Sequence, residues 1–256
     1  MTTVQLAQLQ GLIGSLLWAM GRVGGLCLVA PVFGDSVLPQ RFRLAIMLML
    51  TVVLAPLAPI TIDPMTAEGI TTMVAQLLMG ASIGFVLKLA FEAVSLGGQL
   101  VGQSMSLGFA ETVDPRGGGS SPVLSQFYLL MVMLLFLAMN GHLRLISLLA
   151  DSFHALPPGQ AVIDPKGLYA VVAFATHLFG GAVRVALPAM TSLLMVNIGF
   201  AAISRAAPSM NLFAVGFPIT VTLGFVALWL SLRTVPGAFE SLQNTAWTLM
   251  HELAGG

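Results

Sequence analysis

Charged side chains are scarce in this chain. Only 8% of its 256 residues are Asp, Glu, Lys or Arg, whereas 57% are hydrophobic. A soluble domain carries about 25% charged residues because its surface faces water. The 10 basic and 10 acidic side chains cancel to a net charge of zero and form no basic run, which is the feature that phosphate-backbone binding requires. These shortages indicate a protein that does not live dissolved as a monomer and has no nucleic-acid partner.

Cysteine and the common enzyme motifs are also missing. Cys27 is the single cysteine, so an intrachain disulfide or a Cys-based metal cluster is excluded. The sequence has no HExxH, GxSxG or Walker loop. The best metal-ligating candidates are His142, Asp151 and His154, but on a helix His142 would lie about 180° from Asp151. The sequence therefore predicts no enzymatic activity, no metal site and no cofactor.

Long apolar runs dominate what is present. Spanning a bilayer takes about 20 apolar residues in a helix. Six or seven charge-poor windows approach that length: 12–31, 44–59, 70–87, 123–141, 168–183, 185–204 and 212–232. The first contains no Lys or Arg before Arg22, so we expect it to be retained rather than removed as a signal. Because lipid offers backbone groups no hydrogen bonds, the windows predict an all-α integral membrane protein.

The third window continues as helix-compatible sequence beyond its apolar part. It passes Lys88 and Glu92 and reaches Ala110, interrupted only by two glycines. Roughly 40 helical residues would measure about 60 Å, twice the ~30 Å hydrocarbon core. Lys88 and Glu92 are four residues apart and can partly neutralise each other on one face. Part of this helix must therefore contact something other than lipid.

Small residues at helical spacing predict close helix packing. Gly98, Gly102, Ser106 and Ala110 would lie along one face of the overlong helix, and two further GxxxG pairs occur at Gly21 with Gly25 and Gly80 with Gly84. Such faces let backbones approach in lipid, either within the chain or between subunits. The excess length of the helix favours subunit contact.

Arginines interrupt some of the apolar windows. Arg22 is the clearest intramembrane charge, which is a functional candidate because burying it is costly. It could pair with an acid, cap a neighbouring helix or lie at a protein interface. Arg184 and Arg205 bracket a 20-residue window and are expected at its ends.

A glycine-rich loop follows the overlong helix. Glu111, Asp114 and Pro115 precede Gly117, Gly118 and Gly119. Glycine frees the backbone to take unusual dihedral angles and to move. The loop is either a flexible exposed hairpin or a movable plug.

A second break is predicted between residues 205 and 218. Pro208 and Pro218 each remove a backbone donor, which in a helix interior costs about 3 kcal/mol or more. We expect Arg205 and Asn211 to help satisfy the freed backbone groups, making the segment a structural joint.

These features occur together in one known family. The first part of the pattern contains Arg22, Gly25, Pro31, Phe33, Gly34, Pro39, Arg41 and Arg43; the middle contains Gly80, Gly84, Gly98, Gly102, Leu107, Phe109, Ala110, Asp114, Pro115, Asn140, Gly141, His142, Ser152 and Pro157; and its most specific stretch is Arg205, Pro208, Asn211, Phe213, Gly216, Phe217 and Pro218. In this order and spacing the sequence resembles the FliR family of the bacterial flagellar export gate, with SctT as the injectisome counterpart. Gln99, Ser106 and Ser209 depart from the residues that are common there, which are Glu, Gly and Gln.

The resemblance implies a non-enzymatic subunit of a helical assembly. One copy would join five FliP and four FliQ subunits in a closed spiral of helical hairpins that encloses the conduit for unfolded flagellar proteins, beside other membrane proteins of the export apparatus. Residues 1–204 would be FliP-like and 205–256 FliQ-like. The family's plug maps onto 109–122, with Phe109 as its bulky apolar residue. The assembly would sit in the flagellar basal body at the inner membrane, largely displaced to its periplasmic side.

A small secondary transporter or channel is the alternative. Arg22, Lys88 and Glu92 would then be its ion-handling groups. Internal repeat symmetry would favour this alternative, and the sequence shows no convincing repeat.

Overall fold

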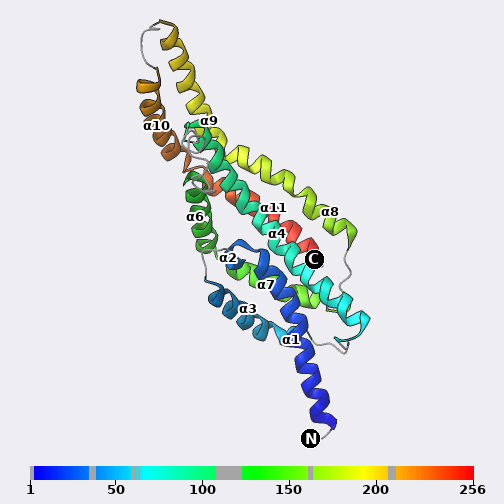
Figure 1. The fold of residues 1–256 in the computed structure, drawn as a ribbon. Coiled ribbons are helices and arrows are strands. Elements are labelled where there is room, and N and C mark those ends of the chain that lie inside the picture. The colour runs from blue at the N-terminus through cyan, green and yellow to red at the C-terminus, as the bar shows by residue number, and fades with distance from the viewer. Residues whose placement is uncertain are drawn as a thin grey trace. The chain divides into compact units, whose positions relative to one another are not determined.

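A computed structural model of the chain describes residues 3–34, 39–58, 62, 64–107, 123–160, 164–206 and 212–256. In these ranges the regular structure is helical throughout, which confirms the all-α prediction. The helices are α1 (Thr3–Val29), α2 (Pro31–Gly34), α3 (Gln40–Leu54), a 3₁₀ turn η1 (Ala55–Leu57), α4 (Ala67–Ser104), α6 (Val123–Ala138), α7 (Gly141–Ala155), α8 (Pro165–Ala173), α9 (Ala175–Ala206), α10 (Leu212–Ser231) and α11 (Val235–Leu253) (Figure 1).

The chain forms two compact units that interleave along the sequence. The first comprises Met1–Leu89, Phe136–Ala175 and Asn244–Gly256, and the second comprises Ala90–Leu135 and Thr176–Gln243. This division reflects packing and does not follow the expected division at residue 204. That expectation concerned resemblance to FliP and FliQ, and it stays a prediction.

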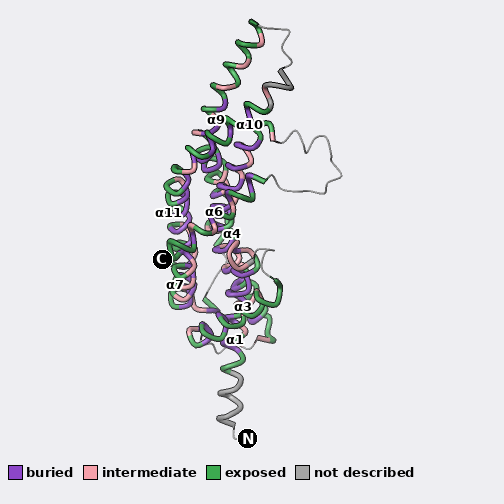
Figure 2. The backbone as a smooth tube through the Cα atoms, turned by 90° about the vertical axis from the view of Figure 1, so that its left-hand side faces the viewer, coloured by how far each residue is buried: buried purple, intermediate pink, exposed green. Residues whose placement is uncertain are grey.

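Two glycine pairs bring α1 and α4 into backbone contact in the first unit. A Cβ atom at Gly25 would overlap the carbonyl of Leu77, and one at Gly80 would overlap the carbonyl of Arg22. Beside this crossing Trp18, Leu26 and other large side chains are fully buried. Figure 2 colours the backbone by burial, with buried residues in purple. Both GxxxG pairs therefore serve packing within the chain, because only the absence of a side chain allows the approach.

Helix α4 has the predicted excess length. Its 38 residues correspond to about 57 Å at 1.5 Å per residue, which is longer than a ~30 Å hydrocarbon core. It is drawn from cyan to green in Figure 1. Lys88 is exposed on it and Glu92 is half-buried.

The last turn of α4 corrects the prediction of a four-residue small face. The Leu107 amide donates to the Gly102 carbonyl at 3.1 Å, the Ser106 amide donates to the Gln103 carbonyl at 3.0 Å, and Ser106 has φ 61°. This is a Schellman motif, in which the left-handed residue ends the helix. Ser106 therefore follows α4 and does not continue its face. Ala110 lies outside the described residues.

Helices also pack closely against one another within the second unit. A Cβ atom at Gly98 would lie 2.8 Å from the Leu124 carbonyl and 2.9 Å from the Tyr128 ring, so this glycine face receives α6. The Phe91 and Phe239 rings meet edge to face at 5.5 Å. Gly98 and Gly102 therefore pack within the chain, and the structure holds no partner that would test the predicted subunit contact.

The predicted windows 168–183 and 185–204 are not separate helices divided at Arg184. They lie in one long helical stretch formed by α8 and α9. Residues 165–206 are helical except at Phe174. Within the described residues, four helices are long and apolar enough to cross a membrane, or up to six if two bent pairs each count as one span. Arg205 lies in the last turn of α9, as expected. Arg184 lies inside α9, so its placement at a helix end was wrong: arginine interrupts a hydropathy window but favours helix.

Candidate functional site

Arg22 lies where α1, α4 and α7 meet in the first unit. Its side chain is fully buried. Nε donates to Gln76 Oε1 at 2.7 Å, Nη1 donates to Ser152 Oγ at 2.9 Å, and Nη2 donates to the Leu156 carbonyl at 2.7 Å. The guanidinium also lies 4.2 Å from the centroid of the Phe153 ring. We call Arg22 with these four partners the Arg22 cluster.

Among the residues that the structure describes, no carboxylate takes part in this cluster. The positive charge instead faces the C-terminal end of α7, where Leu156 is the cap residue and Ser152 lies in the last turn. The last carbonyls of a helix lack intrahelical partners, and the helix dipole places partial negative charge there. Of the three possibilities left open by the sequence, the structure selects the capping of a neighbouring helix.

In the cluster, Arg22 donates each hydrogen bond, and Ser152 and Gln76 are both oriented to accept. The Ser152 hydroxyl donates to the Leu149 carbonyl at 2.6 Å, which leaves its lone pairs for Arg22. The Gln76 oxygen accepts from Arg22, and its Nε2 is buried without a hydrogen-bond partner. Turning this amide over would set two donors against each other, so its orientation follows from Arg22.

The other predicted charged and metal-ligating residues do not gather here. Lys88 and Glu92 are not among the hydrogen-bond partners of Arg22. Asp151 and His154 are exposed on α7, and His142 is half-buried. In the part of the chain that the structure describes, no three His, Cys, Asp or Glu side chains are placed to hold a metal ion.

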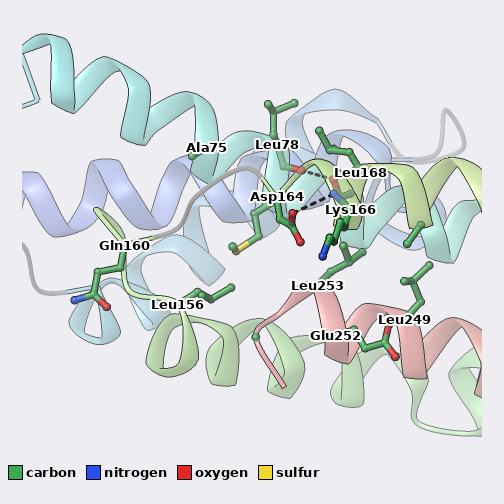
Figure 3. A pocket seen from close by; sticks show the side chains of 15 residues that line it. Ala75, Leu78, Leu156, Gln160, Asp164, Lys166, Leu168, Leu249, Glu252 and Leu253 are labelled. Carbon is green, nitrogen blue, oxygen red and sulfur yellow. Dashed lines mark hydrogen bonds between the residues drawn. The ribbon is translucent and has the colours of Figure 1, made fainter.

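A pocket of 540 Å³ opens beside the cluster in the first unit (Figure 3). Apolar side chains from α4, α8 and α11 form much of its wall, and Asp164, Lys166 and Glu252 add charge. Its lining is Ala75, Leu78, Met79, Ser82, Leu156, Gln160, Asp164, Lys166, Gly167, Leu168, Ala170, Leu249, Glu252, Leu253 and Gly255. Leu156 joins the two sites, because its carbonyl binds Arg22 and its residue lines the pocket.

Sequence reasoning did not predict this pocket. Its lining comes from segments far apart in the chain, which no local pattern connects. One signal was available: Asp164 accepts from the Lys166 amide at 3.0 Å as the N-cap of α8, and Pro165 follows it. Asp before Pro is a typical helix start, and it would have located the charged edge.

The predicted plug residues lie outside the described part of the chain. These are Phe109, Glu111, Asp114, Pro115, Gly117, Gly118 and Gly119. Pro208 and Asn211 of the predicted joint lie outside it as well. Helix α9 ends at Ala206, α10 begins at Leu212, and Pro218 lies inside α10. The plug and the joint therefore stay predictions.

Comparison with known proteins gives the family. Residues 13–246 match the family described as bacterial export proteins, family 1. The chain is 34% identical to flagellar biosynthetic protein FliR of Pectobacterium carotovorum subsp. carotovorum, over 94% of this chain and 93% of that protein. The chain belongs to the FliR family. FliR of Escherichia coli strain K12 is 34% identical over 92% of this chain and 91% of its own, and FliR of Aquifex aeolicus strain VF5 is 31% identical over 86% of each.

FliR membership makes this chain a component of the flagellar export apparatus and confirms the predicted resemblance. Such a role implies other components of the same apparatus. The long apolar helices indicate association with a membrane. The transporter alternative is not favoured, because the match to FliR proteins extends over nearly the whole chain.

Proposed function

We propose that this chain is a non-enzymatic structural subunit of the flagellar export gate, present as one copy with five FliP and four FliQ subunits. The observation that carries the proposal is the match to bacterial export proteins over residues 13–246. In this assembly the chain lines part of the conduit through which unfolded flagellar proteins leave the cell.

The exposed apolar surface supports a role inside a larger assembly. Only 17% of the most apolar window within residues 165–206 is buried inside the chain. Leu187, Leu194, Met195 and Ile198 on α9 are all exposed. A 42-residue helical stretch is longer than a bilayer requires, so lipid alone would not cover it. Partner subunits would cover the remainder.

The location follows from the same assembly. The gate is proposed to lie in the basal body at the bacterial inner membrane, largely displaced to the periplasmic side. A helix of 38 residues is easier to accommodate there, because neighbouring subunits rather than lipid would surround part of α4. Residues 109–122 are proposed as the plug that keeps the conduit closed at rest.

Native mass spectrometry tests the composition. The chain is co-expressed with FliP and FliQ, extracted in mild detergent through a tag on this chain, and weighed as an intact complex. The expected mass corresponds to one copy of this chain, five FliP and four FliQ. A monodisperse homodimer that retains neither partner would contradict the proposal. Omitting FliP expression is the control, and it should remove the complex.

A further inference from the structure

The planar guanidinium of Arg22 binds acceptors on two separate helices at once. Gln76 belongs to α4, whereas Ser152 and the Leu156 carbonyl belong to the end of α7. We propose that Arg22 is a positioning residue that sets a single orientation of α7 on the α1–α4 pair, with its charge held by the C-terminal end of α7. This goes beyond the proposed function, because it assigns how the first unit is held.

The geometry of arginine makes the cluster directional. Its donors point outward in one plane at fixed angles, so acceptors must stand at matching positions. The contacts at Nε, Nη1 and Nη2 are 2.7, 2.9 and 2.7 Å long. Rotation of α7 by one residue, about 100°, would carry Ser152 away from Nη1. A fully buried charge would then lose an acceptor, so other orientations are disfavoured.

The backbone contact between α1 and α4 gives the cluster a firm base. Gly80 of α4 lies against the carbonyl of Arg22 itself, and Gly21 lies beside Gln76 and Met73. Arg22 and Gln76 are therefore held relative to each other before α7 is considered. The hydrogen bonds from Arg22 to Ser152 and to the Leu156 carbonyl then determine the orientation of α7.

The cluster also orients the segment that follows α7. Leu156 gives its carbonyl to Arg22 and lines the 540 Å³ pocket together with Gln160. A Cβ atom at Gly255 would lie 2.8 Å from the Leu156 side chain, so the end of the chain packs on the same residue. Loss of the cluster should therefore disturb the α7 end and this wall of the pocket together.

A purely stabilising role is the competing explanation, and an apolar replacement separates the two. Replacing a whole buried polar cluster with apolar residues of similar size is often neutral or stabilising, whereas removing one partner is costly. The triple variant Arg22→Met, Gln76→Leu, Ser152→Ala should therefore keep the complex stable. It should also remove the directional hydrogen bonds that fix the orientation of α7.

The experiment measures the orientation of α7 in the assembled complex with cysteine-free FliP and FliQ. Cys27→Ala removes the native thiol, and spin labels are attached at Glu68→Cys on α4 and Leu143→Cys on α7, both exposed positions. Pulsed electron spin resonance should give one narrow distance for the parent and a broadened or second distance for the triple variant. A narrow, unchanged distance in a stable triple variant overturns the proposal.

Arg22→Lys decides the matter if the triple variant does not assemble. Lysine keeps the charge but is a compact donor that cannot reach the same acceptors in a plane. A broadened distance supports the proposal, and an unchanged one overturns it. Arg41→Lys on the exposed part of α3 is the matched control.

A further pair of variants tests how the charge is held. Ser152→Asp should be accepted with Arg22 present and should prevent assembly with Arg22→Met, because the new carboxylate would be buried without a partner. Asp151→Asn, an exposed change one residue away, should leave the distance unchanged. If Asp151→Asn broadened the distance as the triple variant is expected to do, the Asp151 carboxylate would hold the charge and the proposal would be overturned. Flagellar export measured in parallel tests only the proposed function.

Discussion

Glycine has its strongest effect here at the crossing of α1 and α4. At Gly25 and Gly80 the space for a Cβ atom is already taken by a backbone carbonyl of the other helix. Backbone cannot rotate away as a side chain can, so any substitution must push the two helices apart. The Arg22 cluster lies at the same crossing and would be displaced with them.

Gly80→Ala should therefore destabilise the subunit, by about 1–3 kcal/mol on the scale of core overpacking. The measurement is thermal unfolding of the complex in mild detergent, with the amount of chain in membranes as a second readout. Gly180→Ala is the matched control, because nothing lies within 4 Å of a Cβ atom at Gly180 on α9. Equal effects of the two substitutions would show that the crossing is looser than the structure indicates.

Ser106 carries a conformation that suits glycine better. With φ 61° it occupies the left-handed position of the Schellman motif at the end of α4. Ser106→Gly should raise stability by about 0.4–1 kcal/mol, since glycine adopts this conformation without a Cβ penalty. Ser104→Gly, two residues earlier at the last residue of α4, should lower it by at most about 0.5–1 kcal/mol. Thermal midpoints that move in the same direction for both would contradict the assignment of the helix end.

At the scale of elements, the loop after α4 is the clearest target. We expect a deletion of residues 112–120 to leave assembly intact and to make the membrane leaky to ions and small solutes. The reason is that a plug that opens for each export session cannot be held by many strong contacts, so it adds little to assembly. Conductance after induction measures the leak.

The control for this deletion is a complex with the full loop at equal abundance. A deletion complex that assembles normally and leaks no more than this parent would reduce the loop to a connector. The plug assignment would then be withdrawn.

Helix ends show why element boundaries were harder to predict than elements. Arg184 was expected at the end of a window, yet α9 continues through it with an exposed side chain whose Nη1 lies 3.4 Å from Ser241 Oγ. Hydropathy reports where apolar residues stop, whereas a helix stops where its backbone hydrogen bonds stop. At α4 that point was set by the left-handed Ser106, which has no strong sequence signal.

At the scale of the whole molecule, apolar surface left exposed by the chain is the dominant feature. Among large hydrophobic side chains Leu28, Met65 and Met195 are 72%, 90% and 76% exposed. Surface of this kind requires lipid or partner protein to cover it.

Expressed without FliP and FliQ, the chain should accumulate less in membranes and be degraded faster than when all three are expressed together. Pulse-chase labelling measures the difference in lifetime, and an unrelated membrane protein in the same cells is the control. A stable, monodisperse preparation of the chain alone would contradict the expectation and would favour a self-sufficient transporter.

The sequence by itself determined the class of protein, the all-helical fold, the overlong third helix and the family. These follow from composition and from patterns that are local along the chain, such as the run of apolar residues through 70–87 and the ordered motif around Arg205. Lipid accepts few backbone arrangements, so an apolar run of sufficient length already implies a helix.

Only the tertiary structure decided what Arg22 does and which glycines meet. The sequence could show that a charge lay in an apolar segment, but its acceptors are 54, 130 and 134 residues away along the chain. The same holds for Gly80, whose neighbour is the carbonyl of Arg22. Contacts between distant segments depend on how helices cross, and a crossing is set by many side chains at once rather than by any local pattern.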